Sequence, residues 1–190
     1  MARNTKSATT KRASNSSTSR NDETKLKELF LEELKDIYWA EKHLIKALPK
    51  MRKACTSEEL ANAFEEHLAI TEEQIGRVEE VFELLEMTPR AKKCEAMEGL
   101  VKEAQNVIEN TDTGSATRDV ALIIAAQKVE HYEIATYGSL VQLAKTMGRD
   151  DIAELMQQTL DEEKEADVIL TELAVSGINI NAENEPEEED

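Results

Sequence analysis

The sequence lacks the features of a disulfide-stabilised or membrane-spanning protein. Its 190 residues contain only two cysteines, Cys55 and Cys94, without a Cys-x-x-Cys pair, so we expect reduced, packed thiols. No stretch approaches the roughly 20 consecutive apolar residues that a membrane span needs. The N-terminus also lacks the apolar core of a secretory signal. We therefore expect a cytoplasmic protein without a membrane partner.

Positive charge is also scarce. The 23 lysines and arginines are outnumbered by 40 acidic residues, which gives a formal net charge of -17. Because a phosphate backbone would be repelled by most of such a surface, the charge argues against a nucleic-acid-binding body, and cations are the more natural partners. The hydrophobic content of 40% is enough for one well-cored globular domain of this length.

The two ends of the chain differ from its middle. Residues 1–23 form a basic segment rich in serine, threonine and asparagine, and residues 179–190 form an acidic one. We expect both to be disordered tails that flank a helical domain over residues 24–178. In an alternative interpretation, the basic tail binds nucleic acid or the acidic surface of a neighbouring subunit.

Strand-like alternation is absent between the tails, and apolar residues recur there at spacings of three and four, which predicts helices. The expected helices cover about 24–54, 57–87, 92–109, 118–147 and 150–175. Pro49 falls late in the first of them and predicts a kink or an early end. Two long hairpins joined by a crossover with a short helix are typical of an all-α, ferritin-like four-helix bundle.

Acidic residues interrupt the apolar stripes of the second hairpin. Glu130 replaces an apolar residue at the centre of one stripe, and Glu133 lies on a neighbouring part of the same helix face. Glu163 and Asp167 face inward on the following helix. Counting outward from the turn at Gly148 brings these four carboxylates to one depth of the bundle. Because buried carboxylates are expensive to desolvate, they indicate a cation or a network of polar partners.

The first hairpin offers further ligands at a common level. Glu41 lies at an inward position of its helix, and His67 lies in the apolar stripe of the next. Counting outward from Thr56 places Glu41 level with Thr71, one helical turn from His67. Less certain candidates on these two helices are Glu33, Asp36 and Gln74.

This donor set favours iron or manganese. Carboxylates with one or two imidazoles suit these ions, whereas zinc sites often use thiolates. Bridging acids could hold two such ions and leave positions open for oxygen or peroxide, although a mononuclear ion remains an alternative. The predicted metal ligands are Glu41, His67, Glu130, Glu133, Glu163 and Asp167. His131 is interpreted as a surface residue. Four aromatic residues are interpreted as boundary aromatics, or alternatively as hydrogen-bond or electron-transfer partners of a metal: Tyr38, Trp39, Tyr132 and Tyr137.

Several segments together resemble a known family. They are Tyr38-Trp39-Ala40-Glu41, Leu48-Pro49-Lys50-Met51, Phe64-Glu65-Glu66-His67-Leu68, Lys93-Cys94-Glu95-Ala96-Met97-Glu98-Gly99-Leu100, Gln127-Lys128-Val129-Glu130-His131-Tyr132-Glu133 and Thr159-Leu160-Asp161-Glu162-Glu163-Lys164. In this order, over about residues 25–178, the chain resembles the ferritin-like stress-response proteins of the YciE and YciF type. The resemblance implies a ferritin-like fold and a link to bacterial stress response.

A more distant resemblance to rubrerythrins bears on the metal. Glu130-x-x-Glu133 followed by Tyr137 is similar to the carboxylate helix of that group. Glu163 with Asp167 is similar to its last ligand helix, in which a histidine usually stands at the place of Asp167. The familiar Glu-x-x-His pair is absent from the second helix. The resemblance therefore implies a metal site that departs from the symmetric di-iron pattern.

Three hypotheses follow. The leading one is a homodimer with a di-iron or di-manganese centre that handles peroxide or oxygen. The second, from a different class, is a non-enzymatic structural or stress protein whose inner carboxylates form hydrogen-bond networks without metal. The third is an iron-storage cage, which would need a shell of many subunits.

Overall fold

A computed structural model describes residues 24–186 of the chain. The predicted basic tail, residues 1–23, and the last four residues of the acidic tail, 187–190, lie outside the described residues. The helices are α1 (Lys25–Ala54), α2 (Glu58–Leu84), α3 (Glu95–Asn110), α4 (Ala116–Thr146) and α5 (Asp150–Leu173), followed by a π-helical turn η1 (Ala174–Ile178) and a short α6 (Asn179–Glu183). The part of the chain so described contains no strand.

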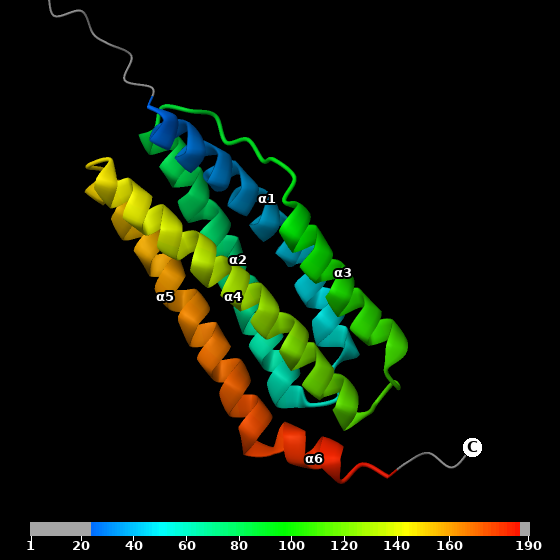
Figure 1. Ribbon diagram of the computed structural model, residues 1–190. Helices are drawn as coiled ribbons and strands as arrows, with labels where there is room; N and C mark the ends of the chain where they lie inside the picture. Colours follow the sequence, from blue (N-terminus) through cyan, green and yellow to red (C-terminus); the bar gives the residue numbers. More distant parts are fainter. Residues whose placement is uncertain (1–23, 187–190) are drawn as a thin grey trace, which may run out of the picture.

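Four long helices form a bundle of two hairpins (Figure 1). Helix α1 packs along α2, and α4 packs along α5, while α2 also contacts α5 and α1 contacts α4. The crossover between the hairpins contains α3, which packs against α1 and α4. The expected all-α bundle, with two antiparallel hairpins and a short extra helix in the crossover, is confirmed.

Polar residues set the starts of the helices. The side chains of Thr24, Ser57 and Ser115 each accept a hydrogen bond from a backbone N–H in the first turn of the helix that follows. The hairpin between α4 and α5 turns at Gly148, whose φ of 70° lies in the left-handed region that glycine adopts without steric cost. The short turns hold neighbouring helices side by side, so inward residues on each pair meet across the core.

Helix α1 does not end early at Pro49, contrary to one of the two outcomes predicted from the sequence. It continues to Ala54, although proline cannot donate the backbone hydrogen bond of its position. The side chains of Ala47, Leu48 and Met51 around it are all buried in the core. Their burial offsets the lost hydrogen bond near the helix end.

Helical structure continues past residue 178, because α6 covers the first residues of the segment expected to form the acidic tail. Ile178 is only 8% exposed and belongs to the hydrophobic core, so burial of its side chain holds this segment against the bundle. Farther along, the Glu185 carboxylate accepts hydrogen bonds from the backbone N–H groups of Ala116 and Thr117 at the start of α4. A carboxylate is favourable there because these N–H groups lack partners within the helix.

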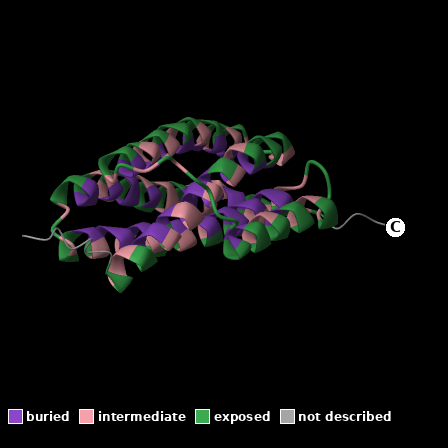
Figure 2. Cartoon of the chain, turned by 90° about the horizontal axis from the view of Figure 1, so that it is seen from above, coloured by how far each residue is buried: buried purple, intermediate pink, exposed green. Residues whose placement is uncertain are grey.

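Buried residues lie on the inner faces of the helices, and exposed residues lie on the outside of the bundle (Figure 2). The largest of the fully buried side chains include Phe30, Leu34, Phe82, Leu122 and Met156. On α1, the half-buried indole of Trp39 stacks on the half-buried imidazole of His43, with ring centroids 3.6 Å apart. Within residues 24–186, no helix combines the length and the apolar character that crossing a membrane requires.

Candidate metal centre

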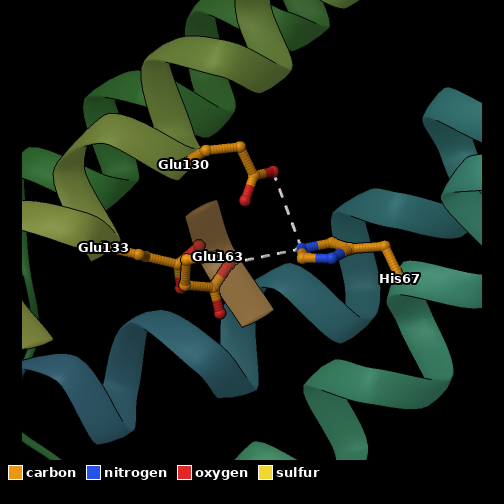
Figure 3. Close-up of side chains that lie close together, drawn as sticks. All are labelled: His67, Glu130, Glu133 and Glu163. Atoms are coloured by element: carbon orange, nitrogen blue, oxygen red, sulfur yellow. Dashed lines mark ion pairs between the residues drawn. The ribbon is translucent and has the colours of Figure 1, made fainter. Parts of the chain in front are cut away.

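One histidine and three glutamates meet in the core of the bundle (Figure 3). They come from three helices: His67 from α2, Glu130 and Glu133 from α4, and Glu163 from α5. Each offers a ligand atom, and these atoms all lie within 4.8 Å of one another. The sequence had predicted all four residues, and counting outward from Gly148 had placed the three glutamates at a similar depth.

The polar atoms of this cluster are poorly satisfied by the protein itself. His67 Nε2 lies 3.6 Å from Glu130 Oε1 and 3.9 Å from Glu163 Oε2, distances too long for hydrogen bonds. Among the described residues, Glu130 Oε2, both carboxylate oxygens of Glu133, Glu163 Oε2 and His67 Nδ1 are buried without a hydrogen-bond partner. Such orphaned groups are costly in a folded protein. Since the oxygens are acceptors and converge, they fit a cation.

Glu41 lies beside this group without being one of its four members. It is completely buried, accepts a hydrogen bond from the Tyr137 hydroxyl, and leaves its Oε2 without a partner in the described chain. Burial raises the pKa of Glu41 well above its usual range, and the negative charge of Glu163 raises that pKa further. Glu41 is thus a fourth buried carboxylate at this depth, as the sequence had indicated.

Burial also governs the ionisation of the neighbouring groups. It raises the pKa values of Glu130 and Glu133 well above their usual range, and the charge of Glu163 is the next cause for both. Burial lowers the pKa of His67, which favours the neutral imidazole that binds metals. Burial raises the pKa of Tyr137, with the charge of Glu41 as the next cause, so this phenol keeps its proton and donates.

A second row of polar residues supports the cluster from α2 and α5. Gln74 Nε2 donates to Glu163 Oε1 at 2.5 Å and to Glu162 Oε2 at 3.2 Å. Arg77 donates to both Glu162 oxygens at 2.6 Å. Gln74, a less certain ligand candidate, instead positions Glu163. The role of Arg77 was not predicted, although its place three residues after Gln74 puts it on the same helix face.

The structure does not bring Asp167 together with the cluster. Its Oδ1 lies 3.3 Å from His131 Nε2 and accepts a hydrogen bond from Gln127 Nε2 at 3.1 Å. The side chain of Asp167 is 24% exposed and that of His131 is 70% exposed, which agrees with the prediction that His131 lies on the surface. Asp167 is one helical turn beyond Glu163, where the bundle begins to open to solvent.

Two other acids considered from the sequence also lie apart from the cluster. Glu33 is exposed on α1. Asp36 accepts a hydrogen bond from the Tyr132 hydroxyl at 3.0 Å, and the same hydroxyl lies 3.1 Å from Cys94 Sγ. Tyr137 is fully buried, so it is not a boundary aromatic; its hydroxyl donates a hydrogen bond to the predicted ligand Glu41, which is closer to the alternative interpretation. Its position four residues after Glu133, one turn along the same helix face, was the signal for this contact.

The fold and the cluster together define the protein as a helical bundle with a cation-compatible group of buried histidine and glutamate residues. Residues 25–183 match the model of the family described as Domain of unknown function (DUF892). The chain belongs to this family.

Relatives of the chain share nearly its whole folded part. Protein YciF of Escherichia coli K12 is 47% identical over 160 residues, which are 84% of this chain and 96% of YciF. The crystal structure of that protein, called a stress protein, matches with a TM-score of 0.77, at 46% identity, over 81% of this chain and 97% of the other. YcfI of Rhodopseudomonas palustris, described as a candidate structural protein, matches with a TM-score of 0.75 at 40% identity, over 80% and 96% of the two chains.

Proposed function

We propose that the protein binds a dinuclear iron or manganese centre and uses it to handle peroxide or oxygen during stress. The observation that carries this proposal is the convergence of orphaned carboxylate oxygens beside a buried imidazole. A hydrogen-bond network would have paired these oxygens with donors. Carboxylate oxygens with one imidazole nitrogen are a donor set that suits iron and manganese.

Charge supports two ions rather than one. Glu41, Glu130, Glu133 and Glu163 are all at most 3% exposed, and a fully ionised set would carry four negative charges. The nearest arginine, Arg77, already pairs with Glu162. Two divalent cations would balance the four carboxylates, whereas a single one would leave half of the charge buried and unpaired. His67, Glu130, Glu133 and Glu163 would hold the ions, with Glu41 completing the set.

Iron or manganese bound there would supply redox chemistry toward oxygen species. The chain itself contributes the surroundings of that chemistry. The Tyr137 hydroxyl holds Glu41 in place, and Gln74 holds Glu163 by donating to the carboxylate oxygen that faces it. Apolar neighbours exclude bulk water, which strengthens the electrostatic attraction between carboxylates and cations. The link to stress rests on the YciF relative. The cytoplasmic location expected from the sequence belongs to the same proposal.

Metal analysis of protein purified without chelators tests the proposal. We expect about two ions per chain and a rise in melting temperature when iron(II) or manganese(II) is added to metal-free protein. The double substitution E130Q/E163Q should abolish both effects. As a matched control, E80Q/E154Q removes two exposed carboxylates from the bundle surface and should change neither result. Absence of bound metal in the parent protein under these conditions would refute the proposal.

A non-enzymatic structural role is the second candidate, and the description of YcfI favours it. In that case the buried glutamates would be protonated and stabilise one another. E130Q/E163Q would then melt like the parent protein with or without added iron. Peroxide consumption by the metal-loaded protein, compared with the same concentration of free metal, distinguishes a reactive centre from an inert one.

A further inference from the structure

A pocket of about 220 Å³ lies between α2 and α5, beside the candidate metal centre. Two members of the cluster, His67 and Glu130, belong to its lining. Both side chains are more than nine-tenths buried, and each has an atom without a partner in the described part of the chain: Nδ1 of His67 and Oε2 of Glu130. The pocket therefore joins the buried ligands to the outside of the bundle.

The walls and the rim of this pocket differ in character. The walls include the apolar residues Ala63, Phe64, Ile70, Ala166, Ile169 and Leu170. Three carboxylates also line it: Glu66, Glu162 and Glu165. Glu162 is engaged by Arg77, but within residues 24–186 neither Glu66 nor Glu165 forms an ion pair, and both are exposed. Two uncompensated negative charges thus stand at the rim, one from each helix.

We propose that this pocket is the entry passage through which divalent cations reach the centre, with Glu66 and Glu165 attracting them to its rim. The inference rests on the proposed metal site and adds the route to it. Rim charges raise the local concentration of cations, and their attraction acts over about 10 Å at moderate ionic strength. The apolar walls offer no competing ligands, so a cation that enters meets His67 and Glu130 next.

The position of His67 supports this direction of entry. It is the most exposed member of the cluster at 8%, whereas Glu133 and Glu163 are at most 1% exposed. Its ring lines the pocket, and its Nε2 points toward the carboxylates of Glu130 and Glu163 (Figure 3). A small rotation of this one side chain would open the way, because no hydrogen bond from the described residues holds its Nδ1.

The rate of metal uptake by metal-free protein tests the passage. Cobalt(II) serves as the probe, and a chromogenic chelator reports the free ion in a stopped-flow instrument. We expect E66Q/E165Q to slow uptake about three- to tenfold at low salt, with a smaller effect at high salt, because screening weakens the attraction. The control E80Q/E154Q changes the net charge equally on the same two helices, away from the pocket, and should take up cobalt at the parental rate.

A steric variant tests the route without altering charge. Ala166→Phe places a bulky ring in the pocket wall and should slow uptake by at least about tenfold at both salt concentrations. Both variants should reach the parental metal content at equilibrium. If E66Q/E165Q and A166F both took up cobalt as fast as the control E80Q/E154Q, the proposed passage would be wrong. If the parent protein itself holds no cobalt at equilibrium, the metal site has failed, and that result is distinct from unchanged rates.

Discussion

When no metal is bound, the buried carboxylates make the stability of the protein depend on pH. The pKa values of Glu41, Glu130 and Glu133 are raised in the folded protein, whereas in the unfolded chain they return to about 4.3. Above that pH the unfolded chain releases protons that the folded protein retains. The free energy of unfolding contributed by these groups is therefore fully present at low pH and falls as the pH rises.

We accordingly expect chelator-treated protein to lose stability between about pH 5 and neutrality, by about 1.4 kcal/mol for each unit by which a pKa is raised. Urea unfolding at a series of pH values measures this slope. The variant E130Q/E133Q removes two of the titrating groups and should show a shallower slope. Parallel curves for the parent and the variant would contradict the prediction, since the exposed acids are common to both.

The two thiols are expected to react slowly in the folded state. Burial raises the pKa of Cys55 to about 12 and also raises the pKa of Cys94, which is 1% exposed. Because the thiolate is the reactive form, a thiol reagent at neutral pH should modify native Cys55 roughly a thousandfold more slowly than an ordinary thiol. Adding denaturant should make both thiols react at the rate of ordinary thiols. The variant C94S assigns the remaining signal to Cys55, and rapid labelling of that native variant would contradict the prediction.

Residue by residue, the acids on inward stripes were predictable and their polar partners were not. Glu130 and Glu133 interrupt an apolar repeat, so the sequence alone marks them. Asp167 interrupts a repeat as well, but His131 and Gln127 are better placed to engage it at the edge of the bundle. Arg77 was missed because a charged residue on a long acidic helix resembles any solvated one.

At the level of elements, one carboxylate links the two hairpins. Asp119, in the first turn of α4, is 2% exposed and accepts hydrogen bonds from the backbone N–H groups of Thr56 and Ser57, at 2.8 and 2.7 Å. It thereby caps the start of α2 from outside that helix. This contact was not predicted from the sequence, because it joins residues 62 and 63 positions apart.

Replacing Asp119 by alanine should lower the free energy of unfolding by about 1 to 3 kcal/mol, because two backbone donors at the start of α2 lose a charged acceptor. Asp119→Asn keeps one acceptor oxygen and should cost less. Chemical unfolding of both variants checks the order. Metal content should stay at the parental value, since Asp119 lies at the end of the bundle, away from His67 and Glu163. Equal stability of the alanine variant and the parent would contradict this role.

The helices themselves were largely predictable, because apolar spacing fixes which face of each turns inward. The ends of the helices were less predictable. Pro49 is tolerated because burial of its neighbours outweighs one missing hydrogen bond. The helical turns after Leu173 depend on two tertiary contacts: Ile178 is buried in the core, and Glu185 binds the start of α4. The local sequence pattern does not predict either contact.

At the scale of the whole molecule, the homodimer expected from the sequence stays a prediction. Large apolar side chains are exposed on α4 and on the end of α5 and beyond: Ile124, Val168, Ile169, Val175 and Ile180. Light scattering coupled to size-exclusion chromatography should give about twice the 21.3 kDa of one chain. A single-chain mass would contradict the dimer, and a shell of many subunits would favour iron storage instead.

The stacked pair of Trp39 and His43 on α1 allows metal binding to be followed by intrinsic fluorescence. Trp39 is the single tryptophan of the chain and lies two residues before Glu41. All indole fluorescence therefore originates from one place in a fixed environment, against the ring of His43. A bound ion that absorbs in the near ultraviolet would quench this fluorescence, so metal binding could be followed without an added label. Because burial lowers the pKa of His43, emission recorded well above pH 6.5 reports loading free of changes in imidazole charge.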